Sequence, residues 1–123
     1  MRVLLVDDNE ELREFLALCL TEASIEVVEA PDAAAALAHA EKEKFDAFVI
    51  DSVMDAGDGL SLVSALRDLK NGRNVPILLM SSISTSLARR MAQSAGCNEF
   101  LVKPFGQMQF LEQVKALERL KGR

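Results

Sequence analysis

Hydrophobic and polar positions follow one order five times along the chain: a short apolar run, then a longer stretch with helical spacing of its apolar residues. Continuous apolar runs are typical of strands that are buried on both faces of a parallel sheet, and three- and four-residue spacing is typical of helices packed on a sheet. The expected strands are 2–6, 26–30, 47–51, 76–80 and 99–102. The pattern therefore predicts five β-α units.

The stretches between the runs carry helix start and stop signals. Asp, Asn and Pro favour helix starts, and Gly or Asn favours helix ends. The expected helices run from Asp8 or Asn9 to about 23, from 31–32 to about 44, from 58–59 to 71–72, from about 85 to 96, and from about 106 to 120. On the first helix, the predicted inner face consists of Leu12, Phe15, Leu16, Cys19 and Leu20.

Five such units predict an α/β, doubly wound (βα)5 fold with one parallel five-stranded sheet and right-handed crossovers. The second strand is half polar and is expected near a sheet edge. Periodicity does not reveal the strand order. The order 2-1-3-4-5 would place the first and third strands side by side, which the acidic cluster described below requires. Residues 1–123 are expected to form a single domain, because no linker or repeat interrupts the pattern.

The net charge of −5 and the pI near 4.9 disfavour direct binding to nucleic acid or to an anionic membrane. Cys19 and Cys97 have no motif spacing, so they are expected to be small apolar core residues in a reducing cytoplasm. No apolar run has the length of a membrane span, and no signal peptide is recognised. His39, the only histidine, is expected at a solvated helix position.

Polar side chains stand at the ends of four of the predicted strands. Asp7 and Asp8 follow the first strand, Asp51 ends the third, Ser81 follows the fourth and Lys103 follows the fifth. Strand carboxyl ends share one edge of a parallel sheet, and ligands bind there. Clustered carboxylates repel one another unless a cation or a proton intervenes. These residues therefore predict a divalent-metal site with a lysine and a hydroxyl opposite, which suits phosphoryl chemistry.

Over essentially its whole length the chain resembles the receiver domain of bacterial two-component response regulators. The resemblance rests on four ordered segments, each weak alone and highly specific together: 6–8 (Val-Asp-Asp), 51–59 (Asp-x-x-Met-x-x-x-Asp-Gly), 75–82 and 100–105 (Phe-Leu-Val-Lys-Pro-Phe). It implies a flavodoxin-like fold of order 2-1-3-4-5. The alternative is a generic flavodoxin-like domain whose acidic residues only cap helices, but caps would not also supply the lysine and the hydroxyl.

The resemblance implies that Asp51 is the phosphoacceptor, a carboxylate nucleophile that becomes an acyl phosphate. It implies that Asp8 binds Mg²⁺ directly and Asp7 partly through water. Asp51 and the backbone carbonyl of Val53 would complete the protein ligands, with Mn²⁺ able to substitute. Mg²⁺ keeps several waters, so this small ligand set suffices.

Three further roles follow from the resemblance. Lys103 would pair with Asp51 at rest and with the phosphoryl group afterwards, and the Lys103–Pro104 bond resembles the family's cis peptide. Ser81 would bond a phosphoryl oxygen once it is present. Phe100 matches the aromatic switch position, and it would turn inward when the Ser81 loop moves. A core aromatic is the open alternative for Phe100.

The chain departs from the family pattern around the acceptor. Val53 and Ile83 are apolar at two positions that flank the acyl phosphate and often carry polar side chains. They are expected to slow hydrolysis, because neither can orient an attacking water. Asp55 stands where the family usually has Pro, and it either tunes metal affinity or faces solvent.

The expected function is a phosphorylation-activated switch that catalyses its own phosphorylation and dephosphorylation without turning over an external substrate. The donor would be a histidine kinase or a histidine phosphotransfer protein. The output would be a downstream protein or a fused domain, bound through the surface of helix 4, strand 5 and helix 5. No output domain follows, so the chain is either a stand-alone regulator or an excised receiver.

One rival is a phosphorylation-independent pseudo-receiver that binds proteins. Another is a phosphohydrolase, which would want an acid where Val53 stands.

Overall fold

The computed structural model describes residues 1–54 and 57–120 of the chain. Its main sheet is parallel, with the spatial order β2-β1-β3-β6-β7. These strands are β1 (Arg2–Val6), β2 (Glu26–Ala30), β3 (Ala47–Asp51), β6 (Ile77–Ser81) and β7 (Glu99–Val102). The predicted order 2-1-3-4-5 of the five long strands is thereby confirmed, and the half-polar second strand lies at an edge.

Five helices connect and cover the strands: α1 (Glu10–Glu22), α2 (Ala33–Lys42), α3 (Gly59–Asp68), α4 (Ser86–Ala95) and α5 (Gln107–Leu117), followed by a 3₁₀ turn, η1 (Glu118–Leu120). Four helices begin at a side-chain cap, namely Asn9, Asp32, Asp58 and Thr85, each of which accepts from a backbone N–H three residues on. Such caps satisfy N–H groups that have no partner within the helix. The predicted helix starts are therefore confirmed, with Asn9 as the cap of α1.

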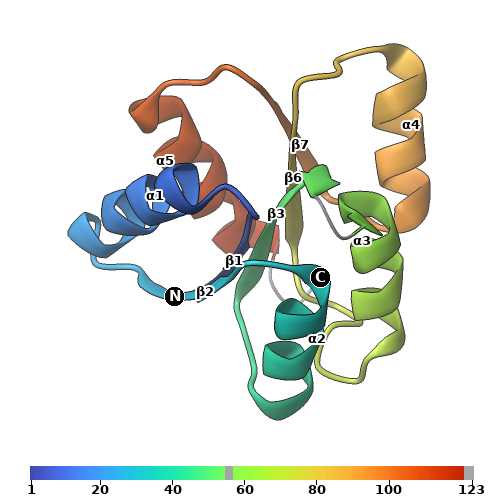
Figure 1. Cartoon of the computed structure of the whole chain (residues 1–123), viewed down its shortest axis with the longest axis horizontal. Coiled ribbons are helices and arrows are strands. Elements are labelled where there is room, and N and C mark those ends of the chain that lie inside the picture. Colours follow the sequence, from blue (N-terminus) through green and yellow to red (C-terminus); the bar gives the residue numbers. More distant parts are fainter. Residues whose placement is uncertain (55–56, 121–123) are drawn as a thin grey trace.

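The sheet separates two hydrophobic cores, because successive side chains of a strand point to opposite faces. Helices α1 and α5 cover one face, and α2, α3 and α4 cover the other (Figure 1). In β1, Val3 and Leu5 pack toward α1 and α5, whereas Leu4 and Val6 pack toward the other three helices. Burial on both faces explains why the central strands are uninterrupted apolar runs.

Two local predictions were wrong. Phe15 is half exposed, because the inward stripe of α1 runs through Leu16, Ala17 and Leu20 instead. Helix α3 ends at Asp68, not near residues 71–72. The Asn71 side chain does not cap α3, because its amide donates to the Ala40 carbonyl at the end of α2, at 3.2 Å.

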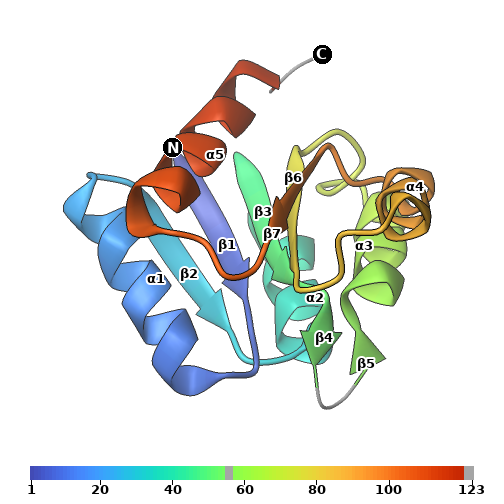
Figure 2. The same cartoon turned by 90° about the horizontal axis from the view of Figure 1, so that it is seen from above.

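A short antiparallel pair, β4 (Val53–Met54) and β5 (Gly57–Asp58), was not predicted. It lies beyond the carboxyl ends of β1 and β3 (Figure 2). Strands of two residues leave no periodicity in the sequence, since a period of two needs several residues to be recognised. This pair shapes the loop that follows Asp51.

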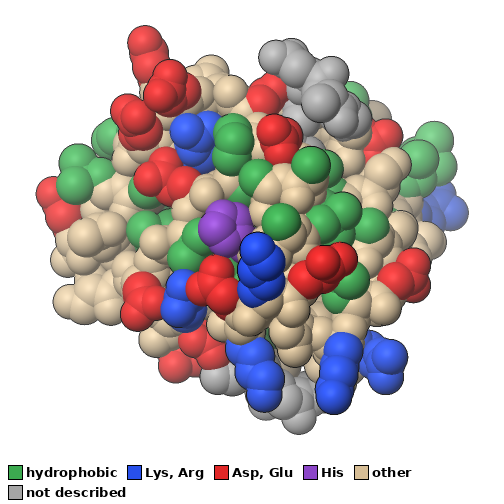
Figure 3. Space-filling view, turned by 60° about the horizontal axis from the view of Figure 1, so that its bottom comes forward, with side chains coloured by type: hydrophobic (Ala, Val, Ile, Leu, Met, Phe, Trp, Pro, Cys, Tyr) green, Lys and Arg blue, Asp and Glu red, His purple; other side chains and the backbone are tan. Residues whose placement is uncertain are grey.

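The remaining expectations concern surface and core chemistry. Cys19 and Cys97 are buried free thiols, as predicted. His39 lies at the surface of α2, where its Nδ1 is 3.2 Å from Glu43 Oε2 (Figure 3). In the described part of the chain, no helix combines the length and the apolar character that crossing a membrane requires.

Candidate functional site

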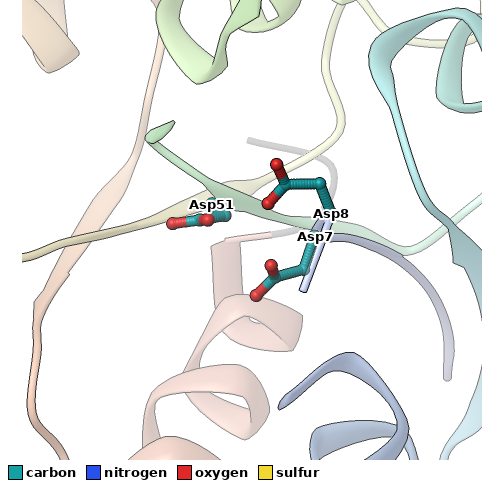
Figure 4. A group of neighbouring side chains, drawn as sticks. All are labelled: Asp7, Asp8 and Asp51. Carbon is teal, nitrogen blue, oxygen red and sulfur yellow. The ribbon is translucent and has the colours of Figure 1, made fainter. Parts of the chain in front are cut away.

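Three carboxylates meet at the carboxyl edge of the sheet. Asp51 is the last residue of β3, and Asp7 directly follows β1, whose Val6 is paired with Ile50. The carboxylate oxygens of Asp7, Asp8 and Asp51 lie within 4.8 Å of one another (Figure 4). The predicted convergence of these residues is therefore observed.

Three contacts fix Asp7, two through its backbone and one through its side chain. Its N–H donates to the Ala30 carbonyl of β2 at 3.2 Å. Its carbonyl accepts from Arg13 Nη1 at 2.9 Å, and Arg13 Nε donates to Glu29 Oε1 at 3.1 Å. The Asn9 N–H donates to Asp7 Oδ1 at 2.9 Å. Arg13 was missed from the sequence, although an arginine one turn after a helix cap and close to the candidate metal ligands Asp7 and Asp8 is well placed to hold their loop.

Asp7 is fully buried, and its second carboxylate oxygen, Oδ2, has no hydrogen-bond partner within the described structure. Burial raises the pKa of Asp7 above its ordinary value, and the nearby Asp51 and Asp8 carboxylates add to that rise. The Asn9 hydrogen bond and the Lys103 ammonium act in the opposite direction on this pKa. The fold thus holds a carboxylate whose ionised form it does not fully stabilise.

The donor set fits a hard divalent cation. Carboxylate oxygens are the ligands that Mg²⁺ prefers, and a cation would neutralise the mutual repulsion of the three aspartates. The unpartnered Oδ2 of Asp7 is the kind of buried polar atom that a cation or its water shell satisfies. The acidic cluster is therefore a candidate metal site.

Lys103 supplies the positive charge opposite the cluster. It directly follows β7, and its Nζ is 2.7 Å from Asp51 Oδ1, in a pair whose side chains are 27% and 7% exposed. Its backbone N–H donates to the Ser81 carbonyl at 2.8 Å, which joins the ends of β6 and β7. The bond that follows, Lys103–Pro104, is cis, as the resemblance implied. The predicted pairing of Lys103 with Asp51 is present.

Ser81 ends β6, one residue beyond the Met80 that is paired with Asp51. Its hydroxyl is engaged within its own loop, because Oγ accepts from the Ile83 N–H at 3.1 Å and donates to the Ile83 carbonyl at 3.3 Å. Ser81 is buried, with 5% of its surface exposed. The hydroxyl thus stands at the end of β6, the strand next to β3, but it is bonded to its own loop.

An apolar cavity of about 230 Å³ adjoins this loop, and Ser81, Ile83, Met91 and Phe100 are among its lining residues. Phe100 is half-buried and packs against the core on the α2–α4 side of the sheet. Val53 is 66% exposed and Ile83 55% exposed, so both apolar side chains are accessible, and both line this cavity. Asp55, for which metal tuning was considered, lies outside the described residues.

The family model of the response regulator receiver domain matches residues 3–115. The transcriptional regulatory protein PrrA of Mycobacterium bovis is 39% identical over 121 residues, which cover 98% of this chain and 51% of that protein. The autoinducer sensor kinase/phosphatase CqsS of Vibrio cholerae is 32% identical over 94% of this chain and 17% of its own length. The chain thus spans about half the length of PrrA and less of the sensor kinase.

Solved structures give the same picture at the level of the fold. The chemotaxis protein CheY4 of Vibrio cholerae matches with a TM-score of 0.91 and 30% identity, over 94% of this chain and 97% of that chain. The receiver domain of the sensor histidine kinase PA1611 of Pseudomonas aeruginosa matches with a TM-score of 0.84 and 30% identity, over 99% of this chain and 98% of that chain. That structure holds a magnesium ion coordinated in its active site cleft.

Proposed function

This chain belongs to the response regulator receiver domain family, and from that premise we propose that it is a phosphorylation-controlled switch whose phosphoryl acceptor is Asp51. The observation that carries the proposal is the contact of 2.7 Å between Asp51 Oδ1 and Lys103 Nζ, beside the acidic cluster of Asp7 and Asp8. A buried carboxylate with a cation at one oxygen and a candidate metal site at its side is arranged to receive a phosphoryl group.

In the proposed reaction, a carboxylate oxygen of Asp51 attacks phosphorus in line with the leaving group. With a phosphohistidine donor, a P–O bond forms as the P–N bond breaks, and the imidazole leaves with the electron pair. The Lys103 ammonium group then pairs with a phosphoryl oxygen in place of the Asp51 carboxylate. We assign Mg²⁺ to the carboxylates of Asp7, Asp8 and Asp51 and to the Val53 carbonyl, where it would neutralise phosphoryl oxygens.

Ser81 and Phe100 are the proposed switch residues. After transfer, a phosphoryl oxygen competes with the Ile83 carbonyl for the Ser81 hydroxyl, and a charged acceptor forms the stronger hydrogen bond. Movement of the Ser81 loop would let Phe100 enter the adjoining cavity, since both residues line it. The surface of α4, β7 and α5 would then change shape, and we assign the binding of a downstream protein or an output domain to it.

We propose that a histidine kinase or a histidine phosphotransfer protein donates the phosphoryl group. The cytoplasm is the proposed location, supported by two buried cysteines that remain free thiols. A pseudo-receiver that binds proteins without phosphorylation is not favoured, because Asp51, Lys103 and both neighbouring aspartates are present and gathered. A phosphohydrolase is less well supported, because an exposed Val53 stands where its second acid would be needed.

The test is phosphorylation by acetyl phosphate with Mg²⁺, followed by intact mass, because the chain has no Trp or Tyr to report the reaction by fluorescence. The wild-type protein should gain one phosphoryl group, Asp51→Asn should gain none, and EDTA should prevent the gain. Asp58→Asn is the matched control, because Asp58 is an exposed cap of α3 and Asn caps equally well. A normal mass gain in Asp51→Asn would show that another residue is the acceptor.

A further inference from the structure

One cationic side chain outside the phosphorylation site contacts the proposed switch residue. Arg89, on α4, places its guanidinium carbon 4.9 Å from the centroid of the Phe100 ring. A guanidinium over an aromatic face at this distance is attracted by the negative face of the ring. Among the described residues, no acidic side chain lies within ion-pair distance of Arg89, so the ring is its assigned partner.

Phe100 stands between two cavities. With Arg89 it lines one of about 150 Å³, and with Ser81 it lines the other, of about 230 Å³. Arg89 does not line the second cavity, and Ser81 does not line the first. The ring is therefore held on the Arg89 side by a contact that it would leave on entering the Ser81 side.

The position of Arg89 on its helix does not by itself favour an arginine. Arg89 is the fourth residue of α4, and a cation in the first turn is disfavoured by the helix dipole. Of the ten residues of α4, only Ala92 is buried. A cation that opposes the helix dipole, on a helix with a single buried residue, is a candidate for a functional contact.

We propose that Arg89 is a positioning residue for the switch: its guanidinium, lying on the ring, stabilises the resting position of Phe100 and so sets how readily phosphorylation turns the ring inward. The inference rests on the proposed function, and it adds the group that opposes the turn. Arg89 contacts the ring in the resting position only, so its removal shifts the population toward the turned position.

The expected change in affinity follows from the strength of the cation–π contact between Arg89 and Phe100. An exposed cation–π contact changes an equilibrium constant by about two- to fivefold at room temperature. A phosphoryl mimic that binds the turned state better gains affinity by the same factor when the resting state dominates. Arg89→Gln should therefore bind beryllofluoride, with Mg²⁺ present, about two- to fivefold more tightly than wild type.

The experiment measures beryllofluoride affinity and the NMR resonances of the Phe100 ring in wild type, Arg89→Gln and Arg90→Gln. Arg90 is the matched control, because it is the neighbouring exposed arginine, its replacement changes the charge equally, and no contact with the Phe100 ring is found for it among the described residues. Without beryllofluoride, Arg89→Gln should show Phe100 resonances displaced toward the bound positions, and Arg90→Gln should not. In a Phe100→Leu background, Arg89→Gln should no longer change the affinity.

Equal affinities and ring resonances in Arg89→Gln and Arg90→Gln would overturn the role of Arg89. An affinity gain that persists in the Phe100→Leu background would also overturn it, because the effect would then not pass through the ring. Failure of the proposed function looks different: wild type itself would neither bind beryllofluoride nor accept a phosphoryl group on Asp51. That result would remove both proposals together.

Discussion

At the scale of single residues, Asp7 is a site residue whose ionised form lowers the stability of the fold. Its carboxyl group is fully buried and one oxygen has no partner in the described structure, while Asp8 and Asp51 lie close by. Its pKa is raised, first by burial. In the pH range between the pKa of the unfolded chain and that of the folded protein, the unfolded chain has already lost this proton. The free energy of unfolding therefore falls as pH rises through that range.

The first prediction follows from this fall in the free energy of unfolding with rising pH. In EDTA at neutral pH, Asp7→Asn should be more stable than wild type by about 1 kcal/mol, which corresponds to about 3 to 5 °C in Tm. The difference should shrink as pH falls toward the ordinary pKa of an aspartate and vanish below it, where wild-type Asp7 is protonated in both states. Mg²⁺ should raise the Tm of wild type and not that of Asp7→Asn, because only wild type keeps the full ligand set.

Thermal unfolding followed by circular dichroism over a pH series measures these differences. Glu11→Gln is the charge-matched control, because it removes one negative charge from an exposed position. It should leave the Tm within about 1 °C of wild type, as expected for a surface substitution. A lower Tm for Asp7→Asn in EDTA at neutral pH would contradict the account of Asp7.

A second prediction at this scale concerns Val53 and Ile83. Both are exposed, on the loops that follow Asp51 and Ser81, and neither can hydrogen-bond a water placed in line for attack on the proposed acyl phosphate. The phosphorylated protein should therefore be long-lived. Val53→Asn with Ile83→Glu should lose its phosphoryl group about tenfold or more faster, which is a part of the roughly hundredfold or more that general acid–base assistance contributes. The loss is followed by intact mass after the donor is removed.

The control for the lifetime prediction is Leu87→Gln, which makes another exposed apolar residue polar on the first turn of α4. Its rate of dephosphorylation should match that of wild type. The double variant should also accept the phosphoryl group normally, since Asp51, Lys103 and the acidic pair are untouched. Equal lifetimes in the double variant and wild type would show that these side chains do not control hydrolysis.

At the scale of elements, the strands and helix starts were predictable because each leaves a signal within its own residues. Buried strands are apolar runs, and a cap such as Asp58 stands directly before its helix. The errors occurred where distant contacts decide. Asn71 carries a helix-end signal, but its amide bonds to the Ala40 carbonyl of α2. Phe15 is apolar and near the inward stripe of α1, but the rotation of the helix leaves it half exposed.

The junction of β3 and α3 gives a prediction at this scale. A Cβ on Gly59 would lie 2.4 Å from the Asp51 carbonyl oxygen and 2.9 Å from Ser52 Cα. Gly59→Ala should therefore force α3 away from the end of β3, at a cost of about 1–3 kcal/mol, as for other overpacked sites. Because the displaced backbone is that of Asp51, phosphorylation by acetyl phosphate should slow as well.

Urea unfolding and the phosphorylation rate measure the two effects of Gly59→Ala. Gly106→Ala is the matched control, because no atom outside Gly106 and its two chain neighbours lies within 4 Å of the position that its Cβ would take. That substitution should leave both quantities close to wild type. If Gly59→Ala also left the phosphorylation rate unchanged, close packing of α3 on β3 would not be what positions Asp51.

At the scale of the whole molecule, the two edges of the sheet carry different tasks. The carboxyl edge gathers the acidic residues and Lys103, and this grouping was predictable because parallel strands must share that edge. At the opposite edge, where the strands begin, Arg67 links the segments that precede β6 and β7. The sequence did not single out this residue. Nothing near residue 67 reveals that its partners lie in a following loop and beyond α4, because those contacts exist only once the helices have packed.

Arg67 donates to the carbonyls of Gly72, Val75 and Gly96, at 2.7, 2.6 and 2.7 Å, and to Asn98 Oδ1 at 3.0 Å. Arg67→Gln should remove most of these bonds and destabilise the protein by about 2 kcal/mol or more, because half-buried carbonyls lose a charged donor. The affinity for Mg²⁺, measured by calorimetry on folded protein, should not change, since the acidic cluster stands at the other edge of the sheet. Arg73→Gln, which alters an exposed arginine in the same loop, should be nearly neutral in urea unfolding. A loss of Mg²⁺ affinity in Arg67→Gln at a temperature where the variant is folded would show that the two edges are coupled.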